Sequence, residues 1–151
     1  MGRDQRTELD GLDGGERGRV LVVDDEPLVV SSTTRILRRV GFDTMGCCGP
    51  LEALEVFREE RGRFDAVIVD HFMPGMSGLA LAERLHSMSP DVPLLIVSAY
   101  TGEIDREAAN RAGVLEVLTK PLTASEFLES LELADRIRTG DPRPLVLTAS
   151  P

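Results

Sequence analysis

Short runs of apolar, mostly β-branched residues alternate along the chain with longer segments whose apolar residues recur at helical spacing. The short runs predict strands over residues 20–23, 42–47, 66–69, 94–97 and 114–118. The longer segments predict helices over residues 27–40, 50–61, 77–88, 104–112 and 125–138. Strand therefore alternates with helix through the whole patterned region.

The same pattern predicts how these elements pack. Strands that read as continuous Val, Ile and Leu runs are typical of a parallel sheet that is covered by helices on both faces. Five strand–helix units with right-handed crossovers give a doubly wound α/β domain. Pro27 and Pro50 suit the first turn of a helix, and Ser125 is the expected cap of the last one. Leu51 and Leu54 are assigned to the core face of the second helix.

Length and charge narrow the class of protein. A chain of 151 residues fits one ordinary domain. We expect a flexible leader or linker over 1–18, the domain over 19–138 and a C-terminal tail over 139–151. The net charge of −9 disfavours binding to nucleic acid. Without a membrane-spanning run or a secretory signal, this chain is expected to be cytoplasmic and not inserted in a membrane.

The two cysteines are adjacent, at Cys47 and Cys48. A disulfide between neighbours closes a strained ring, and the sequence offers too few further ligands at suitable spacing for a metal–thiolate site. We therefore expect two reduced thiols at a strand end.

Acidic residues follow two of the predicted strands. Asp24 and Asp25 come after the first strand, and Asp70 ends the third. The carboxyl ends of neighbouring parallel strands meet at one edge of a sheet, where open α/β folds place their ligands. Carboxylates that converge there repel one another unless a cation neutralises them, and a sparse set of oxygen ligands suits Mg²⁺. A solvated turn is the alternative for each residue taken singly.

Two further strand ends carry a hydroxyl and a cation. Ser98 and the small residue Ala99 follow the fourth strand, and Lys120-Pro121 follows the fifth. A hydroxyl, a fixed positive charge and a metal around one carboxylate can stabilise the oxygens of a transferring phosphoryl group. Each feature alone is weak, and the conjunction of all of them indicates a phosphoryl-transfer site.

At these positions the sequence resembles the receiver domain of bacterial two-component response regulators. The matching motifs are Val-Val-Asp24-Asp25-Glu26, Val-Asp70 with Met73-Pro74-Gly75-Met76-Ser77-Gly78, Val97-Ser98-Ala99 and Lys120-Pro121. The resemblance implies a flavodoxin-like (βα)5 fold, a five-stranded parallel sheet in the order 2-1-3-4-5. It also implies that Asp70 is the phosphoacceptor for a phosphohistidine on a sensor histidine kinase or a histidine phosphotransfer domain.

The resemblance further assigns the supporting residues. Asp24, Asp25, Asp70 and the backbone carbonyl of Phe72 would hold Mg²⁺, with Mn²⁺ as an alternative ion. Ser98, the Ala99 backbone N–H and Lys120 would contact the phosphoryl oxygens, and the Lys120–Pro121 peptide bond is expected to be cis. Apart from phosphorylation and dephosphorylation at Asp70, no substrate turnover is expected.

Two features depart from the family pattern. The family places an aromatic switch residue three positions before the lysine, and here that position is Val117. Phe72 and Tyr100 put bulky aromatics two residues beyond Asp70 and Ser98. We hypothesise that these two rim residues slow the entry of hydrolytic water, and solvent-facing side chains without a kinetic role are the alternative.

The cellular context stays open at this level. The Gly-rich leader and the segment 113–118 are similar to receivers of hybrid sensor histidine kinases, which would tether the domain to a membrane sensor. A free-standing single-domain response regulator is the alternative, and a weak homodimer is compatible with either. A small acidic phosphohydrolase is a distant alternative, as is a docking domain that works without phosphorylation. The downstream partner is not predicted.

Overall fold

A parallel sheet of five strands forms the centre of the computed structural model, which describes residues 17–60 and 63–140. The strands are β1 (Arg19–Asp24), β2 (Asp43–Cys48), β3 (Ala66–Asp70), β4 (Leu94–Ser98) and β5 (Val114–Thr119). Their order in the sheet is β2-β1-β3-β4-β5, and every neighbouring pair is parallel. The predicted flavodoxin-like class and strand order are confirmed.

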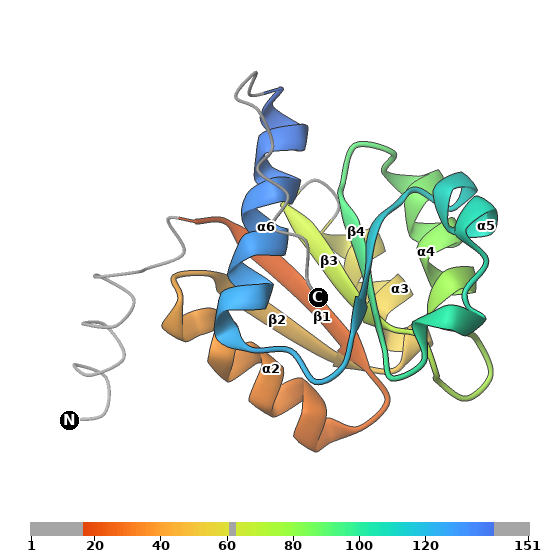
Figure 1. The fold of residues 1–151 in the computed structure, drawn as a ribbon, viewed down its shortest axis with the longest axis horizontal. Coiled ribbons are helices and arrows are strands. Elements are labelled where there is room, and N and C mark those ends of the chain that lie inside the picture. The colour runs from red at the N-terminus through yellow and green to blue at the C-terminus, as the bar shows by residue number, and fades with distance from the viewer. Residues whose placement is uncertain (1–16, 61–62, 141–151) are drawn as a thin grey trace.

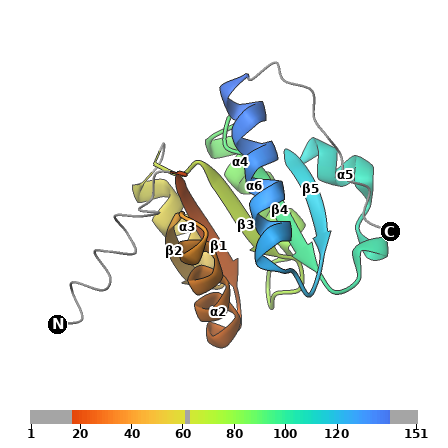
Figure 2. The same cartoon turned by 60° about the vertical axis from the view of Figure 1, so that its left-hand side comes forward.

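Helices cover both faces of the sheet, as Figures 1 and 2 show. Helices α2 (Pro27–Arg39) and α6 (Ala124–Thr139) pack together on one face. Helices α3 (Pro50–Glu59), α4 (Gly78–Met88) and α5 (Arg106–Arg111) lie on the other face, and a short 3-10 turn, η1 (Thr101–Glu103), precedes α5. Because all five strands are parallel, they end at the same edge of the sheet, at the bottom of the view in Figure 1.

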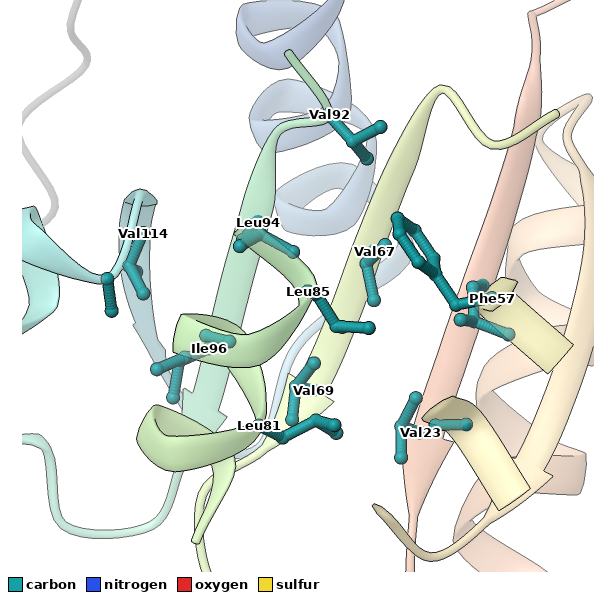
Figure 3. Close-up of a cluster of buried hydrophobic side chains, with 14 of the residues drawn as sticks. Val23, Phe57, Val67, Val69, Leu81, Leu85, Val92, Leu94, Ile96 and Val114 are labelled. Carbon is teal, nitrogen blue, oxygen red and sulfur yellow. The ribbon is translucent and has the colours of Figure 1, made fainter. Parts of the chain in front are cut away.

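The larger core cluster lies between the sheet and the layer of α3, α4 and α5. Figure 3 shows side chains from the central strands meeting Leu81 and Leu85 of α4 and Phe57 of α3. Strands β3 and β4 are buried along their whole length, and β1 is buried beyond its first residue. Strand β5, in contrast, is mostly half-buried, because it is an edge strand with a neighbour on one side only.

Several local predictions were wrong. Leu51, assigned to the core, is 74% exposed, because the first turn of α3 begins directly after β2 ends and lies at the edge of the sheet. The last helix is capped by Thr123 rather than Ser125, and Thr123 forms a reciprocal capping box with Glu126. The fourth predicted helix is shorter than expected, since Asp105 caps it and α5 begins at Arg106.

The predicted leader falls almost wholly outside the described residues, and so does most of the predicted tail. The predicted end of the second helix at Arg61 also lies outside them, and α3 ends at Glu59. Within the part of the chain that the structure describes, no helix is both long enough and apolar enough to cross a membrane.

The two neighbouring thiols have different environments, and we expect different reactivities. Both are free; Cys47 is buried and Cys48 is exposed. Burial, reinforced by the charge of Glu52, raises the pKa of the Cys47 thiol to about 12.

The two thiols should therefore differ in their rate of alkylation. Because the thiolate is the nucleophile and only a very small fraction of Cys47 is ionised near pH 8, this thiol should react slowly. Iodoacetamide should modify one thiol in the native protein, at Cys48, and both in denaturant. Equal rates at both positions, measured by peptide mass spectrometry, would contradict this assignment.

Candidate functional site

The ends of the three central strands bring buried polar side chains to one edge of the sheet. Asp24 ends β1, Asp70 ends β3 and Ser98 ends β4. Their exposed fractions are 4%, 7% and 0%. Because β3 lies between β1 and β4 in the sheet, Asp70 is at the centre of this group.

Three carboxylates converge around that centre. One oxygen from each of Asp24, Asp25 and Asp70 lies within 4.8 Å of the others. Octahedral Mg²⁺ binds oxygens at about 2.1 Å, which puts neighbouring ligands about 3 Å apart and opposite ligands about 4.2 Å apart, so the three carboxylates would close in around one ion. Asp25 is the half-buried member of the set. The donor set is composed of carboxylate oxygens, as Mg²⁺ prefers, and the residues present fit the ion.

Lys120 supplies the positive charge that the carboxylates face in the structure. Its Nζ lies 2.6 Å from Oδ1 of Asp70 and 3.2 Å from Oδ2 of Asp24. Burial by itself lowers the pKa of Lys120, but its hydrogen bond to Asp70 and the charges of Asp70 and Asp24 outweigh this, and the pKa is raised overall. The ammonium group therefore stays charged at neutral pH.

Asp70 is the carboxylate whose ionised form its surroundings disfavour. Its pKa is raised from the usual aspartate value, first by burial and then by the charges of Asp24 and Asp25, while Lys120 opposes the shift. One ammonium group thus leaves the negative charge of the cluster incompletely balanced. A bound cation would relieve the repulsion.

Ser98 is held in place by neighbouring backbone groups. Its Oγ accepts a hydrogen bond from the Tyr100 backbone N–H at 3.2 Å, and its carbonyl accepts one from the Lys120 N–H at 2.9 Å. The second bond joins the last residue of β4 to Lys120, the residue that directly follows β5. A rotation of the Ser98 hydroxyl toward a phosphoryl group would release the Tyr100 N–H.

Gly78, the first residue of α4, packs tightly against the backbone at the end of β3. A Cβ atom on Gly78 would lie 2.4 Å from the carbonyl oxygen of Asp70 and 2.8 Å from Cα of His71. The Gly78 N–H donates to the His71 carbonyl at 2.8 Å, and Ser77 caps the helix by accepting from Ala80. Only glycine fits here without displacing the end of β3.

The structure brings together Asp24, Asp25, Asp70 and Lys120, and it places Ser98 at the end of the strand beside Asp70. The Lys120–Pro121 peptide bond is cis. Roles for the Phe72 carbonyl and the Ala99 N–H stay predictions. Sequence reasoning quoted Gly78 only as part of a motif, and nothing in a linear sequence shows that its Cβ position would meet Asp70.

The rim and switch positions also have defined surroundings. Phe72 is 48% exposed and Tyr100 is 68% exposed, beside the site rather than in the core. The ring of His71 contacts Phe72 edge-on, with centroids 4.9 Å apart. Val117 is partly buried and packs against the larger core cluster.

The family comparison identifies the domain type. Residues 20–132 match the model of the response regulator receiver domain. The transcriptional regulatory protein PrrA of Mycobacterium tuberculosis is 36% identical over 120 residues, which cover 80% of this chain and 51% of PrrA. The probable transcriptional regulatory protein TcrX of the same organism is 34% identical over 126 residues, covering 83% of this chain and 53% of TcrX. The chain thus spans about half the length of these relatives.

Solved structures agree on the fold. A response regulator receiver domain protein from Clostridium thermocellum superposes with a TM-score of 0.76 at 24% identity, covering 81% of this chain and 97% of the other. The response regulator TrrA of Thermotoga maritima, solved with Mg²⁺ and BeF, gives a TM-score of 0.70 at 28% identity, covering 78% and 98%.

A methyl group at position 78 should displace the backbone at the end of β3 and destabilise the folded domain. In Gly78→Ala the new Cβ must push the end of β3 or the start of α4, so we expect a loss of about 1–3 kcal/mol of unfolding free energy despite the better helix propensity of alanine. Urea denaturation measures the loss. Gly102→Ala is the matched control, because nothing lies within 4 Å of its Cβ position. Equal stability of the two variants would refute the close-approach argument.

Proposed function

Because the chain belongs to the family of response regulator receiver domains, we propose that Asp70 accepts a phosphoryl group from a phosphohistidine of a kinase or phosphotransfer protein. The observation that carries this proposal is the 2.6 Å contact between Lys120 and an Asp70 carboxylate that is 7% exposed beside two further carboxylates. Buried ionisable groups with shifted pKa values cluster at functional sites, and phosphoryl transfer uses a carboxylate nucleophile next to fixed positive charge.

The reaction follows from the positions of the groups. A carboxylate oxygen of Asp70 attacks phosphorus and forms a P–O bond, while the P–N bond to the donor imidazole breaks and the imidazole retains the electron pair. Lys120 is close enough to Asp70 to move its hydrogen bond onto a phosphoryl oxygen as the acyl phosphate forms. The Ser98 hydroxyl is the second donor to these oxygens once it leaves Tyr100.

Asp24, Asp25 and Asp70 would hold Mg²⁺, with the Phe72 carbonyl as a further ligand and Mn²⁺ as an alternative ion. When bound, the ion adds positive charge next to the phosphoryl oxygens. The similar protein TrrA was solved in complex with Mg²⁺ and BeF, which supports a Mg²⁺ site in this domain type.

The phosphorylated state would be read at the loops beside Ser98. Val117 carries no aromatic ring, so the fifth strand lacks the switch residue that the family uses. The Ser98 hydroxyl, in contrast, is bonded to the backbone just before η1, and η1 is tied to β5 by a 3.4 Å contact between the Thr101 and Thr119 hydroxyls. Movement of Ser98 would therefore reach η1 and α5.

The rival phosphohydrolase function is less well supported. Such enzymes place a general acid two residues after the nucleophilic aspartate, and here Phe72 has no proton to donate.

The names of the similar proteins bear on whether the domain belongs to a response regulator or to a hybrid kinase. PrrA and TcrX are named as transcriptional regulatory proteins, which favours a response regulator over the hybrid-kinase receiver that the leader and the segment 113–118 suggested.

Phosphorylation at a single residue tests the proposal. With Mg²⁺ and phosphoramidate, wild type should gain the mass of one phosphoryl group, and Asp70→Asn should gain none. Omission of Mg²⁺ should slow the gain strongly, because the carboxylate cluster then repels the donor. Intact-mass spectrometry reports the labelling. Continuous release of phosphate without a labelled protein would indicate the hydrolase instead, and labelling of Asp70→Asn would overturn the assignment of the acceptor.

The aromatic rim should set how long the acyl phosphate lasts. Phe72→Ala and Tyr100→Ala remove large side chains that lie beside the site, so water should reach the phosphoryl group more easily and shorten its lifetime several-fold. Loss of the label after removal of phosphoramidate measures this. Ile137→Ala, at an exposed apolar residue of α6, is the control. Unchanged lifetimes in both rim variants would contradict a shielding role.

A further inference from the structure

Strand β2 lies at one edge of the sheet, so in the described part of the chain it has a neighbouring strand on one side only. The Asp43 N–H donates to the Gly18 carbonyl at 2.9 Å, toward the β1 side. In a parallel ladder, a residue directs its N–H and its C=O to the same side, and the next residue directs both to the other side. Thr44, Gly46 and Cys48 therefore point their backbone groups outward, away from β1.

Two charged side chains bond to these outward groups. Nη2 of Arg38, in the last turn of α2, donates to the Thr44 carbonyl at 3.4 Å. The Cys48 N–H donates to Oε2 of Glu52, in the first turn of α3, at 2.9 Å. Helices α2 and α3 pack on opposite faces of the sheet, and each sends one long side chain to the same open edge. We refer to Arg38 and Glu52 as the guards.

The middle of the β2 edge carries no side chain. Gly46 is exposed, and a Cβ atom there would overlap with the side chain of Val30 in α2. The outward N–H and C=O of Gly46 are therefore not covered by a side chain of their own residue. Asp43 is the one charged residue within β2, so the strand itself offers little charge repulsion. An open edge of this composition is a template for pairing with another strand.

The edge is complementary to the same edge of a second copy. In an antiparallel pair with a two-fold axis at Gly46, Thr44 of each copy would face Cys48 of the other, and all the outward residues of β2 would be used. Each Thr44 carbonyl would then accept from the Cys48 N–H of the other copy. These are the two groups that the guards hold in the structure.

We propose that Arg38 and Glu52 keep the β2 edge closed, and that without them β2 pairs with the β2 of a second copy. The inference goes beyond the proposed phosphoacceptor function and does not depend on it. Both guards are exposed, and charged side chains placed at a sheet edge hinder edge-to-edge association. Antiparallel pairing would also direct the carboxyl edges of the two sheets in opposite directions, so the two Asp70 sites would stay apart.

Removal of both guards tests this inference. Arg38→Ala/Glu52→Ala changes two exposed side chains, so the fold should persist. We expect the dissociation constant of the dimer to fall by about tenfold or more relative to wild type, because each guard competes with strand pairing by one hydrogen bond. Sedimentation velocity measures the association, with a reducing agent that prevents disulfides between exposed Cys48 thiols. Hydrogen exchange at high protein concentration should show new protection of amides within Asp43–Cys48.

Two further variants serve as controls. Arg39→Ala/Glu55→Ala removes the same charges from the same two helices, and in the described chain neither residue bonds to β2. Its self-association should match that of wild type. Glu52→Gln should also match wild type, because the amide oxygen can still accept from the Cys48 N–H.

Each outcome bears on a defined part of the inference. Equal self-association of the double guard variant and wild type would refute the role of the guards. A dimer of that variant whose β2 amides exchange as fast as in the monomer would refute the edge as the contact surface. Phosphoramidate should label Asp70 equally in both proteins. Failure of that labelling in both would count against the proposed function and would leave the edge result unaffected.

Discussion

The pairing of one ammonium group with several buried carboxylates is the interaction on which the site depends. Lys120 reaches both Asp70 and Asp24, at the ends of two neighbouring strands, from a loop that follows a third. A single positive charge does not balance the cluster, and burial together with the neighbouring carboxylates raises the pKa of Asp70. The folded domain thus carries an excess of negative charge at this edge, which a bound cation would relieve.

The tight packing of the rest of the domain offsets the free-energy cost of these buried charges. Strands β3 and β4 are fully buried, and α4 closes against the end of β3 so closely that Gly78 has no room for a Cβ atom. The rigid scaffold keeps the carboxylates from moving apart. The segment after Ser98 lies beyond the strand end, and its backbone donates a hydrogen bond to the Ser98 hydroxyl.

Parallel topology also explains why the residues of the proposed site lie at one edge of the sheet. All five strands deliver their following loops to the same side, so a residue shortly after any strand lies near Asp70. The polar residues at the ends of β1, β3 and β4 lie together for this reason, and they form the proposed phosphoacceptor site.

The sequence by itself determined the class of fold and the set of site residues. Periodicity of apolar residues is a local property, and it identified the strands, the helices and their alternation. It also gave the polar residues at four strand ends, because they directly follow apolar runs. Tertiary structure decided what depends on the neighbours of a residue. Leu51 fits the helical apolar pattern yet points to solvent, since the first turn of α3 lies at the edge of the sheet. The half-buried state of β5 depends on its place at the edge, and the restriction at Gly78 depends on the carbonyl of Asp70. Burial and close approach are properties of pairs of segments that are distant along the chain, and only folding brings them together.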